Sequence, residues 1–157
     1  MQHIVSSGRP WSLDAMSSGE RQRVAAMAES LAQAAKSGHS LQALRGKNLA
    51  VLCEVSECPG LAGFCRAAEA QGARVTHIRP SEALTPSPHG PDAVGQLLGR
   101  LYDAIDCHGL APEVVEQLAR TSGTPVFNEL GCQGSTALLN APVDEFTLQA
   151  LLLSALA

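Results

Sequence analysis

One stretch constrains the fold of this chain more than any other, because a short apolar run passes directly into a helical pattern. Residues 49–53 have the composition of a buried strand, and residues 54–66 lead from it into a helix. The apolar positions of that helix recur at i, i+3, i+4 and i+7, namely Leu61, Phe64, Cys65 and Ala68. Pro59 suits the first helical position, and Gly72 suits the stop. We therefore expect a strand–turn–helix unit of an α/β protein.

The same alternation continues along the chain. Further strands are predicted at residues 74–79, from residue 102 onward, and at residues 124–128. Two helical patterns lie between them, one with Val94, Leu97, Leu98 and Leu101 on a single face and one that begins at Pro112 and buries Val115, Leu118 and Ala119. This order predicts an α/β fold, a three-layer domain whose parallel sheet of about four strands has helices on both faces.

The segments outside this alternation have simpler signals. Residues 1–16 are expected to be irregular, and residues 81–91, with three prolines and a glycine, are expected to form a loop without regular structure. Ser17 and Glu20 have the spacing of a capping box. The helix that they open should end near Gly38, with four residues on its buried face, Val24, Met27, Leu31 and Ala34.

Charge and composition exclude several classes of function. The chain of 157 residues carries a net charge of −4 and has no run of lysine or arginine, so nucleic acid and membrane surfaces are not expected partners. No apolar stretch is long enough to span a bilayer, and the N-terminus does not resemble a secretory signal. The five cysteines are scattered and odd in number. This favours reduced thiols in a cytoplasmic protein.

A family resemblance becomes visible in residues 52–68, which read Leu-Cys-Glu-Val-Ser-Glu-Cys-Pro-Gly-Leu-Ala-Gly-Phe-Cys-Arg-Ala-Ala. Without a gap, this stretch resembles the phosphate-binding loop of the aspartate and ornithine carbamoyltransferases, roughly Leu-Phe-Glu-Lys-Pro-Ser-Thr-Arg-Thr-Arg-x-Ser-Phe-Glu-x-Ala-Ala. Residues 44–47 look similar to the family's Leu-x-Gly-Lys, and residues 102–105 to its Tyr-x-Asp-Ala-Ile. Residues 124–128 are similar to its Val-Pro-Val-Ile-Asn. The resemblance implies the fold of the family's N-terminal, carbamoyl-phosphate-binding domain.

The chain departs from the family at the positions that bind phosphate. Glu54 matches, but the family's Ser-Thr-Arg-Thr-Arg is replaced by Glu57, Cys58, Pro59, Gly60 and Leu61. The resemblance implies that two arginines that neutralise carbamoyl phosphate have become a proline and a leucine. The family's Arg-Thr, which binds the carbamoyl group, falls at His108 and Gly109. These positions therefore form a degenerate ligand loop, and no catalytic residue is predicted.

The last family motif, His-Pro-x-Gln, has two possible alignments. Without a gap it falls on residues 135–138, where it is absent; with a short deletion, Gln133 keeps its place after Cys132. The sequence leaves both alignments open. The family's second, amino-acid-binding domain has no counterpart in residues 1–157, which we read as a single domain.

The C-terminus resembles the helix that returns to the first domain in this family. Asp144 can cap a helix over residues 143–156, with Leu148, Leu151, Leu152 and Ala155 as an apolar stripe. We expect this helix to pack back on the domain, which would place the deletion of the second domain between about residues 139 and 142. Since family members are trimers built through their first domain, the resemblance also implies a homotrimer.

Three functions are compatible with these residues. The favoured one is a catalytically inactive relative with a structural, scaffold or regulatory role, because the charges that stabilise the family's reaction are lost. The alternatives are a module that binds another small ligand and a residual carboxyl- or carbamoyltransferase-type enzyme acting with a partner. That partner could be a full-length carbamoyltransferase or a pathway enzyme. No cofactor or metal is expected.

New chemistry at the same loop is a narrower possibility. The inherited fold would bring Cys58, His108 and Cys132 toward the ends of three strands, where they could act as nucleophile and base or ligate zinc. The cysteines lack the short spacing of a zinc site, and Glu57 would raise the pKa of Cys58. For Glu54 we expect only hydrogen bonds to backbone N–H groups of the loop.

Overall fold

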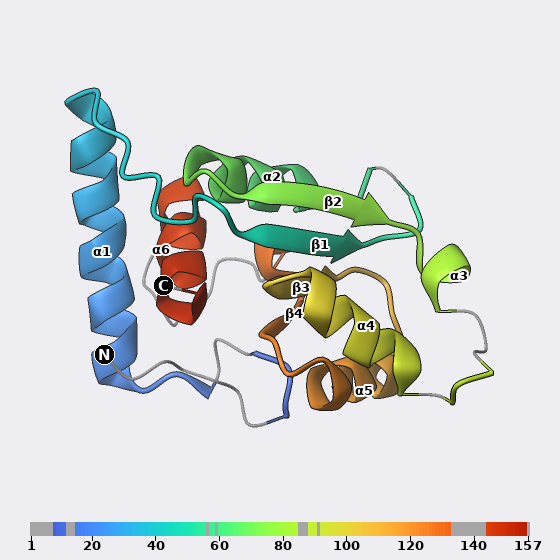
Figure 1. Ribbon diagram of the computed structural model, residues 1–157. Coiled ribbons are helices and arrows are strands. Elements are labelled where there is room, and N and C mark those ends of the chain that lie inside the picture. Colours follow the sequence, from blue (N-terminus) through green and yellow to red (C-terminus); the bar gives the residue numbers. More distant parts are fainter. Residues whose placement is uncertain are drawn as a thin grey trace.

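A computed structural model describes residues 8–11, 15–55, 57–58, 60–84, 88–90, 92–132 and 144–156. Four strands form one parallel sheet in the order β2-β1-β3-β4 (Figure 1). The strands are β1 (Asn48–Leu52), β2 (Arg74–Ile78), β3 (Ala104–Cys107) and β4 (Val126–Asn128). The helices are α1 (Ser18–Lys36), α2 (Leu61–Ala70), α3 (Pro80–Ala83), α4 (Ala93–Leu101), α5 (Pro112–Ser122) and α6 (Glu145–Leu156), with a 3-10 turn η2 (Leu130–Cys132). The predicted α/β fold is confirmed.

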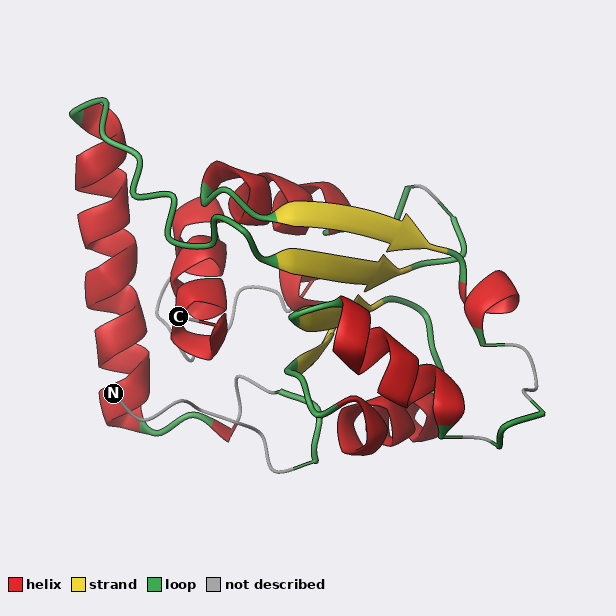
Figure 2. Ribbon diagram, viewed as in Figure 1, coloured by secondary structure: helices red, strands yellow, loops and turns green. Residues whose placement is uncertain are grey.

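Helices lie on both faces of the sheet (Figure 2). Alternating side chains of the strands supply two separate cores, one on each face. Leu49 and Val51 of β1 face a cluster with α1, α2 and α6, while Ala50 and Leu52 face α4 and α5. Because consecutive strand residues point to opposite faces, a run that is apolar at every position belongs to a strand covered on both sides. The burial of both sets confirms that the sheet has helices on each face.

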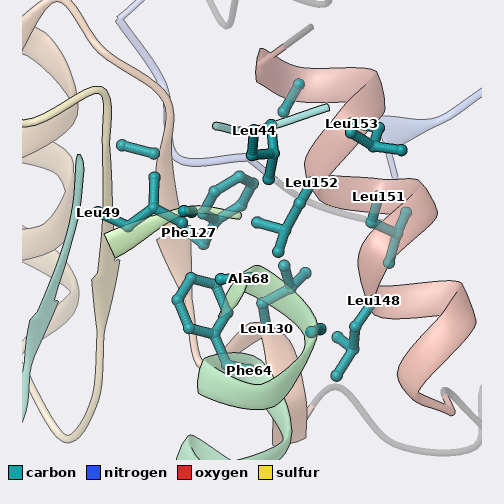
Figure 3. Close-up of a cluster of buried hydrophobic side chains, with 14 of the residues drawn as sticks. Leu44, Leu49, Phe64, Ala68, Phe127, Leu130, Leu148, Leu151, Leu152 and Leu153 are labelled. Carbon is teal, nitrogen blue, oxygen red and sulfur yellow. The ribbon is translucent and has the colours of Figure 1, made fainter. Parts of the chain in front are cut away.

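The C-terminal helix α6 lies inside the larger core. Its residues Leu148 to Leu153 are all buried, and it packs between α1 and α2. Figure 3 shows Leu152 directed toward Phe127 of β4, with Phe64 of α2 beside it. A helix that is apolar around its whole circumference needs cover on all sides. The prediction that this helix packs back on the domain is confirmed, and its burial exceeds the single stripe that was expected.

Local signals set the start of α1 as predicted. Ser17 Oγ accepts a hydrogen bond of 3.2 Å from the N–H of Glu20, and the Glu20 carboxylate accepts one of 2.7 Å from the N–H of Ser17. This capping box satisfies two N–H groups that the first helical turn leaves free. The helix ends at Lys36, close to the predicted stop.

Three expectations are wrong in detail. Trp11 forms a parallel bridge with Phe127, although it lies in the segment expected to be irregular. The backbone N–H of Trp11 donates to the Val126 carbonyl at 2.7 Å. The loop predicted for residues 81–91 contains most of the one-turn helix α3, because Pro80 suits a first helical position. On α4, Leu97 and Leu101 are each 55% exposed, since Gly95 and Leu98 face the core instead.

No helix within the described ranges is both long enough and apolar enough to cross a membrane.

Candidate functional site

The four parallel strands end at the same edge of the sheet. Leu52 pairs with Ile78 on one side and with Cys107 on the other, and Cys107 pairs with Asn128. The loops that follow these residues therefore meet at one edge, which is where open parallel sheets bind ligands. Each predicted site position that the structure describes lies on one of these loops or beside it.

Glu54 connects the loop after β1 to the start of α3 through hydrogen bonds. Its carboxylate accepts hydrogen bonds from the N–H of Ser81, at 3.0 Å, and from the Ser81 hydroxyl. These two bonds, with a smaller contribution from the charge of Arg79, hold the pKa of Glu54 below its usual value. The expectation of bonds only to backbone N–H groups of the loop is wrong in part, because one partner is the Ser81 hydroxyl and the backbone N–H belongs to Ser81 of α3. The carboxylate is committed to its own protein.

The helix after this loop begins at Leu61 and not at residue 59. Gly60 is the N-cap in a left-handed conformation, with φ 74°, and Leu61 is buried in the core. Pro59, predicted as the first helical residue, lies outside the described residues. Gly131 of η2 lies against Gly60 so closely that a Cβ on Gly131 would stand 2.1 Å from the Gly60 carbonyl oxygen. The turn η2 thus covers the N-terminus of α2.

Two cysteines on this loop form a disulfide, Cys53–Cys58, with Cα atoms 7.0 Å apart. Cys53 is buried at the end of β1, and Cys58 is half-buried before α2. The expectation that all cysteines are reduced thiols is therefore wrong for this pair. Scattered spacing indicated free thiols, but the loop folds back and brings the two sulfurs together. Cys65 and Cys107 are free thiols.

A buried ionisable pair lies at the end of the neighbouring strand. Nε2 of His108 is 2.6 Å from a carboxylate oxygen of Asp106, and both side chains are almost completely buried. The other oxygen of Asp106 accepts a bond from the N–H of Leu130, at 3.4 Å. Among the described residues, Nδ1 of His108 is buried without a hydrogen-bond partner. The carboxylate therefore fixes one ring nitrogen, and no described residue bonds the other.

Burial and pairing act against each other in this dyad. Burial raises the pKa of Asp106, and the hydrogen bond and charge of His108 only partly oppose it. Burial alone would lower the pKa of His108, but the hydrogen bond that its ring donates to Asp106, the charge of Asp106 and the charge of Glu129 raise it overall. Both shifts favour the state in which the pair holds a proton.

Asp106 was not among the residues predicted from the sequence. The signal was present, because an aspartate stands inside the apolar run of β3, two residues before His108 and therefore on the same face of the strand. Asp103, by contrast, is structural: its carboxylate accepts a 2.8 Å bond from the N–H of Asn48. Such an internal acid, spaced i, i+2 from a histidine, was a sign of a buried pair.

The remaining predicted positions are distributed around this edge. Glu57 and Gly109 are exposed, and the N–H of Gly109 donates to the Glu129 carboxylate at 3.3 Å. Gln133 lies outside the described residues, so the two alignments of the last motif stay open. Across the described ranges, no group of three His, Cys, Asp or Glu side chains could hold a metal ion. The approach of Cys58 to His108 stays a prediction.

A hollow of about 400 Å³ lies at the opposite edge of the sheet, lined in part by Lys47, Arg100 and Asp103. The strands begin there, so it is separate from the loops that carry the predicted positions. We do not regard this hollow as the candidate site.

Comparisons with known proteins give one consistent result. No family model matches the chain. It is 36% identical over 104 residues to a catabolic ornithine carbamoyltransferase of Pseudomonas putida and, equally, to an ornithine carbamoyltransferase of Actinobacillus pleuropneumoniae. Each match covers 66% of this chain and 31% of the relative. The chain thus spans about a third of the length of these relatives.

Solved structures share the fold at lower sequence identity. Ornithine carbamoyltransferase from Pyrococcus furiosus aligns with a TM-score of 0.67 at 21% identity, over 80% of this chain and 40% of that one. The catalytic subunit of M. jannaschii aspartate transcarbamoylase aligns with a TM-score of 0.64 at 16% identity, over 86% and 42%. The resemblance noted in the sequence is confirmed. The homologues and structural neighbours of this chain are ornithine and aspartate carbamoyltransferases.

Proposed function

We propose that the chain is a catalytically inactive carbamoyltransferase-like protein with a structural, scaffold or regulatory role in the cytoplasm. The supporting observation is the start of α2. Leu61, at a position that the resemblance assigns to an arginine, is buried in the core, and η2 lies directly against Gly60. Neither residue offers the charged hydrogen bonds that a phosphate requires.

Three acidic side chains at this edge oppose an anionic substrate, and the nearby Arg79 lies beside one of them, Glu54. Glu57 is exposed on the loop, Glu54 is bonded to Ser81, and Glu129 lies beyond β4. Each lost charge-assisted hydrogen bond removes roughly 1.5–3 kcal/mol of affinity. Losing two arginines and gaining an acid therefore removes useful affinity for carbamoyl phosphate.

Calorimetry with carbamoyl phosphate tests this proposal. We expect no binding heat at millimolar ligand and no carbamoyl transfer to ornithine or aspartate. A full-length ornithine carbamoyltransferase, measured in the same buffer, is the positive control. Micromolar binding by this chain would overturn the proposal.

We also propose a homotrimer, with a full-length carbamoyltransferase or a pathway enzyme as a further partner. The resemblance suggests the trimer, and α4 supports an interface because it presents Leu97 and Leu101 to solvent one turn apart. Light scattering should give three times the mass of the 16.3 kDa chain. A monomeric mass would refute this assembly.

For the domain organisation, we propose a single carbamoyltransferase-like domain from which the second domain was deleted, with α6 as the retained returning helix. The support is that α6 is buried between α1 and α2. Removing residues 143–157 should then cause aggregation or a large loss of stability. A truncated product that remains soluble and equally stable would contradict this role of α6.

A further inference from the structure

The Cys53–Cys58 disulfide and the Asp106–His108 pair follow neighbouring strands of the sheet, although they lie far apart in sequence. The N–H of His108 donates to the Leu52 carbonyl at 2.8 Å, so His108 follows β3 where Cys53 follows β1. Cys53 belongs to the core on the α2 face, and so does Leu130, whose N–H bonds Asp106. The disulfide and the dyad therefore share one face at one edge of the sheet.

We propose that Cys53–Cys58 is a thiol–disulfide exchange site for small thiols and that the Asp106–His108 pair serves its proton transfer. This assignment is independent of carbamoyl transfer and adds a chemical activity to an otherwise inactive domain. It would make the loop between β1 and α2 a place where the redox state of the surroundings acts on the fold.

The two sulfurs differ in access, which sets the direction of the reaction. Cys58 is half-buried in the loop, whereas Cys53 is only 1% exposed. An incoming thiolate can reach the more exposed sulfur, and the buried sulfur is then the leaving group. This assigns Cys58 as the attacked atom and Cys53 as the thiol that needs a proton.

His108 has the hydrogen bonding expected of the proton donor. Asp106 holds Nε2, while Nδ1 is buried without a partner among the described residues. A buried nitrogen without a hydrogen bond is costly, unless it is used in another state of the protein. Within the described part of the chain, the charged groups that influence His108 are Asp106 itself and Glu129 from the loop after β4.

The exchange is balanced in two steps. A small thiolate attacks the Cys58 sulfur, the S–S bond breaks, and its electron pair leaves on Cys53, which takes a proton from the His108 imidazolium. A second thiolate then attacks the small-molecule sulfur of the mixed disulfide and forms an S–S bond to it. Cys58 leaves as a thiolate that solvent protonates, and His108 regains its proton from solvent. Overall, two small thiols are oxidised to one disulfide, and the protein gains two thiols.

Alkylation of protein purified without a reductant tests the pairing. After denaturation in iodoacetamide, we expect two of the five cysteines to escape alkylation. The tryptic peptide of residues 48–66 holds Cys53, Cys58 and Cys65, so fragmentation must show the link between the first two. Cys65→Ser is the matched control and should keep the protected pair, whereas Cys58→Ser should abolish it. Complete alkylation, or a link to Cys65, would overturn the proposal.

Reduction under native conditions tests the exchange. Dithiothreitol should reduce the disulfide while circular dichroism shows that the protein stays folded. Removing the dithiothreitol in air should re-form the disulfide. A disulfide that opens only in denaturant would be a structural cross-link, and the proposal would be wrong.

The role of His108 is tested by the rate of that reduction. His108→Gln should slow it about tenfold or more near neutral pH and change its pH profile. Glu129→Gln, on an exposed side chain, should slow it by a smaller factor, and it provides a folded variant if His108→Gln is unstable. Rates and profiles equal to those of the unaltered protein in both variants would remove the dyad from the mechanism.

Discussion

The side-chain amide of Gln71 donates a hydrogen bond of 2.7 Å to the side-chain oxygen of Gln149, and both residues are buried. Gln71 caps the end of α2, and Gln149 lies in the first half of α6. The oxygen of Gln71 also accepts a 3.4 Å bond from the N–H of Ala43. Because both side chains are buried, this polar contact fixes one position of α6 along α2.

Replacing Gln149 by leucine should therefore destabilise the protein. The change leaves the Gln71 amide buried without its acceptor, which costs about 1–3 kcal/mol. Chemical denaturation measures the loss. Gln96→Leu, on the exposed face of α4, is the matched control and should change stability by no more than about 0.5 kcal/mol.

Leu152→Ala tests the packing of α6. The side chain is fully buried and is directed toward Phe127 (Figure 3), so its truncation should cost about 2–5 kcal/mol. Leu97→Ala makes the same chemical change at a side chain that is 55% exposed. Equal thermal shifts in the two variants would contradict the burial of α6.

Gly99→Ala tests the close contact of α4 with α5. A Cβ at this position would stand 1.9 Å from the Ser122 carbonyl oxygen, so the helices must separate, at a cost of about 1–3 kcal/mol or more. Gly19→Ala, in the first turn of α1, meets only Ser17 Oγ at 4.0 Å and should be neutral or stabilising. Thermal unfolding of both variants decides the point.

The dyad predicts how stability changes with pH. The pKa of His108 is raised in the folded protein, so the folded state holds this proton more tightly than the unfolded chain does. The stability that this proton binding contributes is fully present below the usual histidine pKa of about 6.5. It is lost as the pH rises through the higher pKa of His108 in the folded protein. The free energy of unfolding should therefore fall from slightly acid to alkaline pH.

Asp106→Asn provides the check, because it replaces the charged acceptor that raises the His108 pKa by a neutral amide. The slope of stability against pH should become smaller in this variant. The exposed Asp92→Asn should keep the slope of the unaltered protein. A slope that is unchanged by Asp106→Asn would show that another group carries the dependence.

The fold could be predicted because its signals are local. The apolar run of β1, the capping box at Ser17 and the proline that opens α5 each specify an element from a few neighbouring residues. Their order then leaves few arrangements of a parallel sheet. The exposed Leu97 and Leu101 were read wrongly because the side of α4 that faces the core is set by glycines that allow close approach of α5.

The site was less predictable because its contacts are not local. The pairing of Cys53 with Cys58 depends on how the loop folds. The two cysteines are five positions apart, which is not the spacing of a common cysteine motif. The bridge from Trp11 to Phe127 joins segments more than a hundred positions apart, for which periodicity gives no signal. Resemblance indicated the loops that meet at the sheet edge, but not the contacts among their side chains.

The central place of α6 has a consequence for synthesis on the ribosome. The helix that completes the larger core follows every strand and every other helix, yet α1 near the beginning packs against it. A nascent chain that has already made α1, α2 and the sheet still exposes their apolar surfaces until α6 emerges. Contacts of such long sequence separation form late and slowly. During that interval the unfinished domain should depend on chaperones or on a partner chain to avoid aggregation.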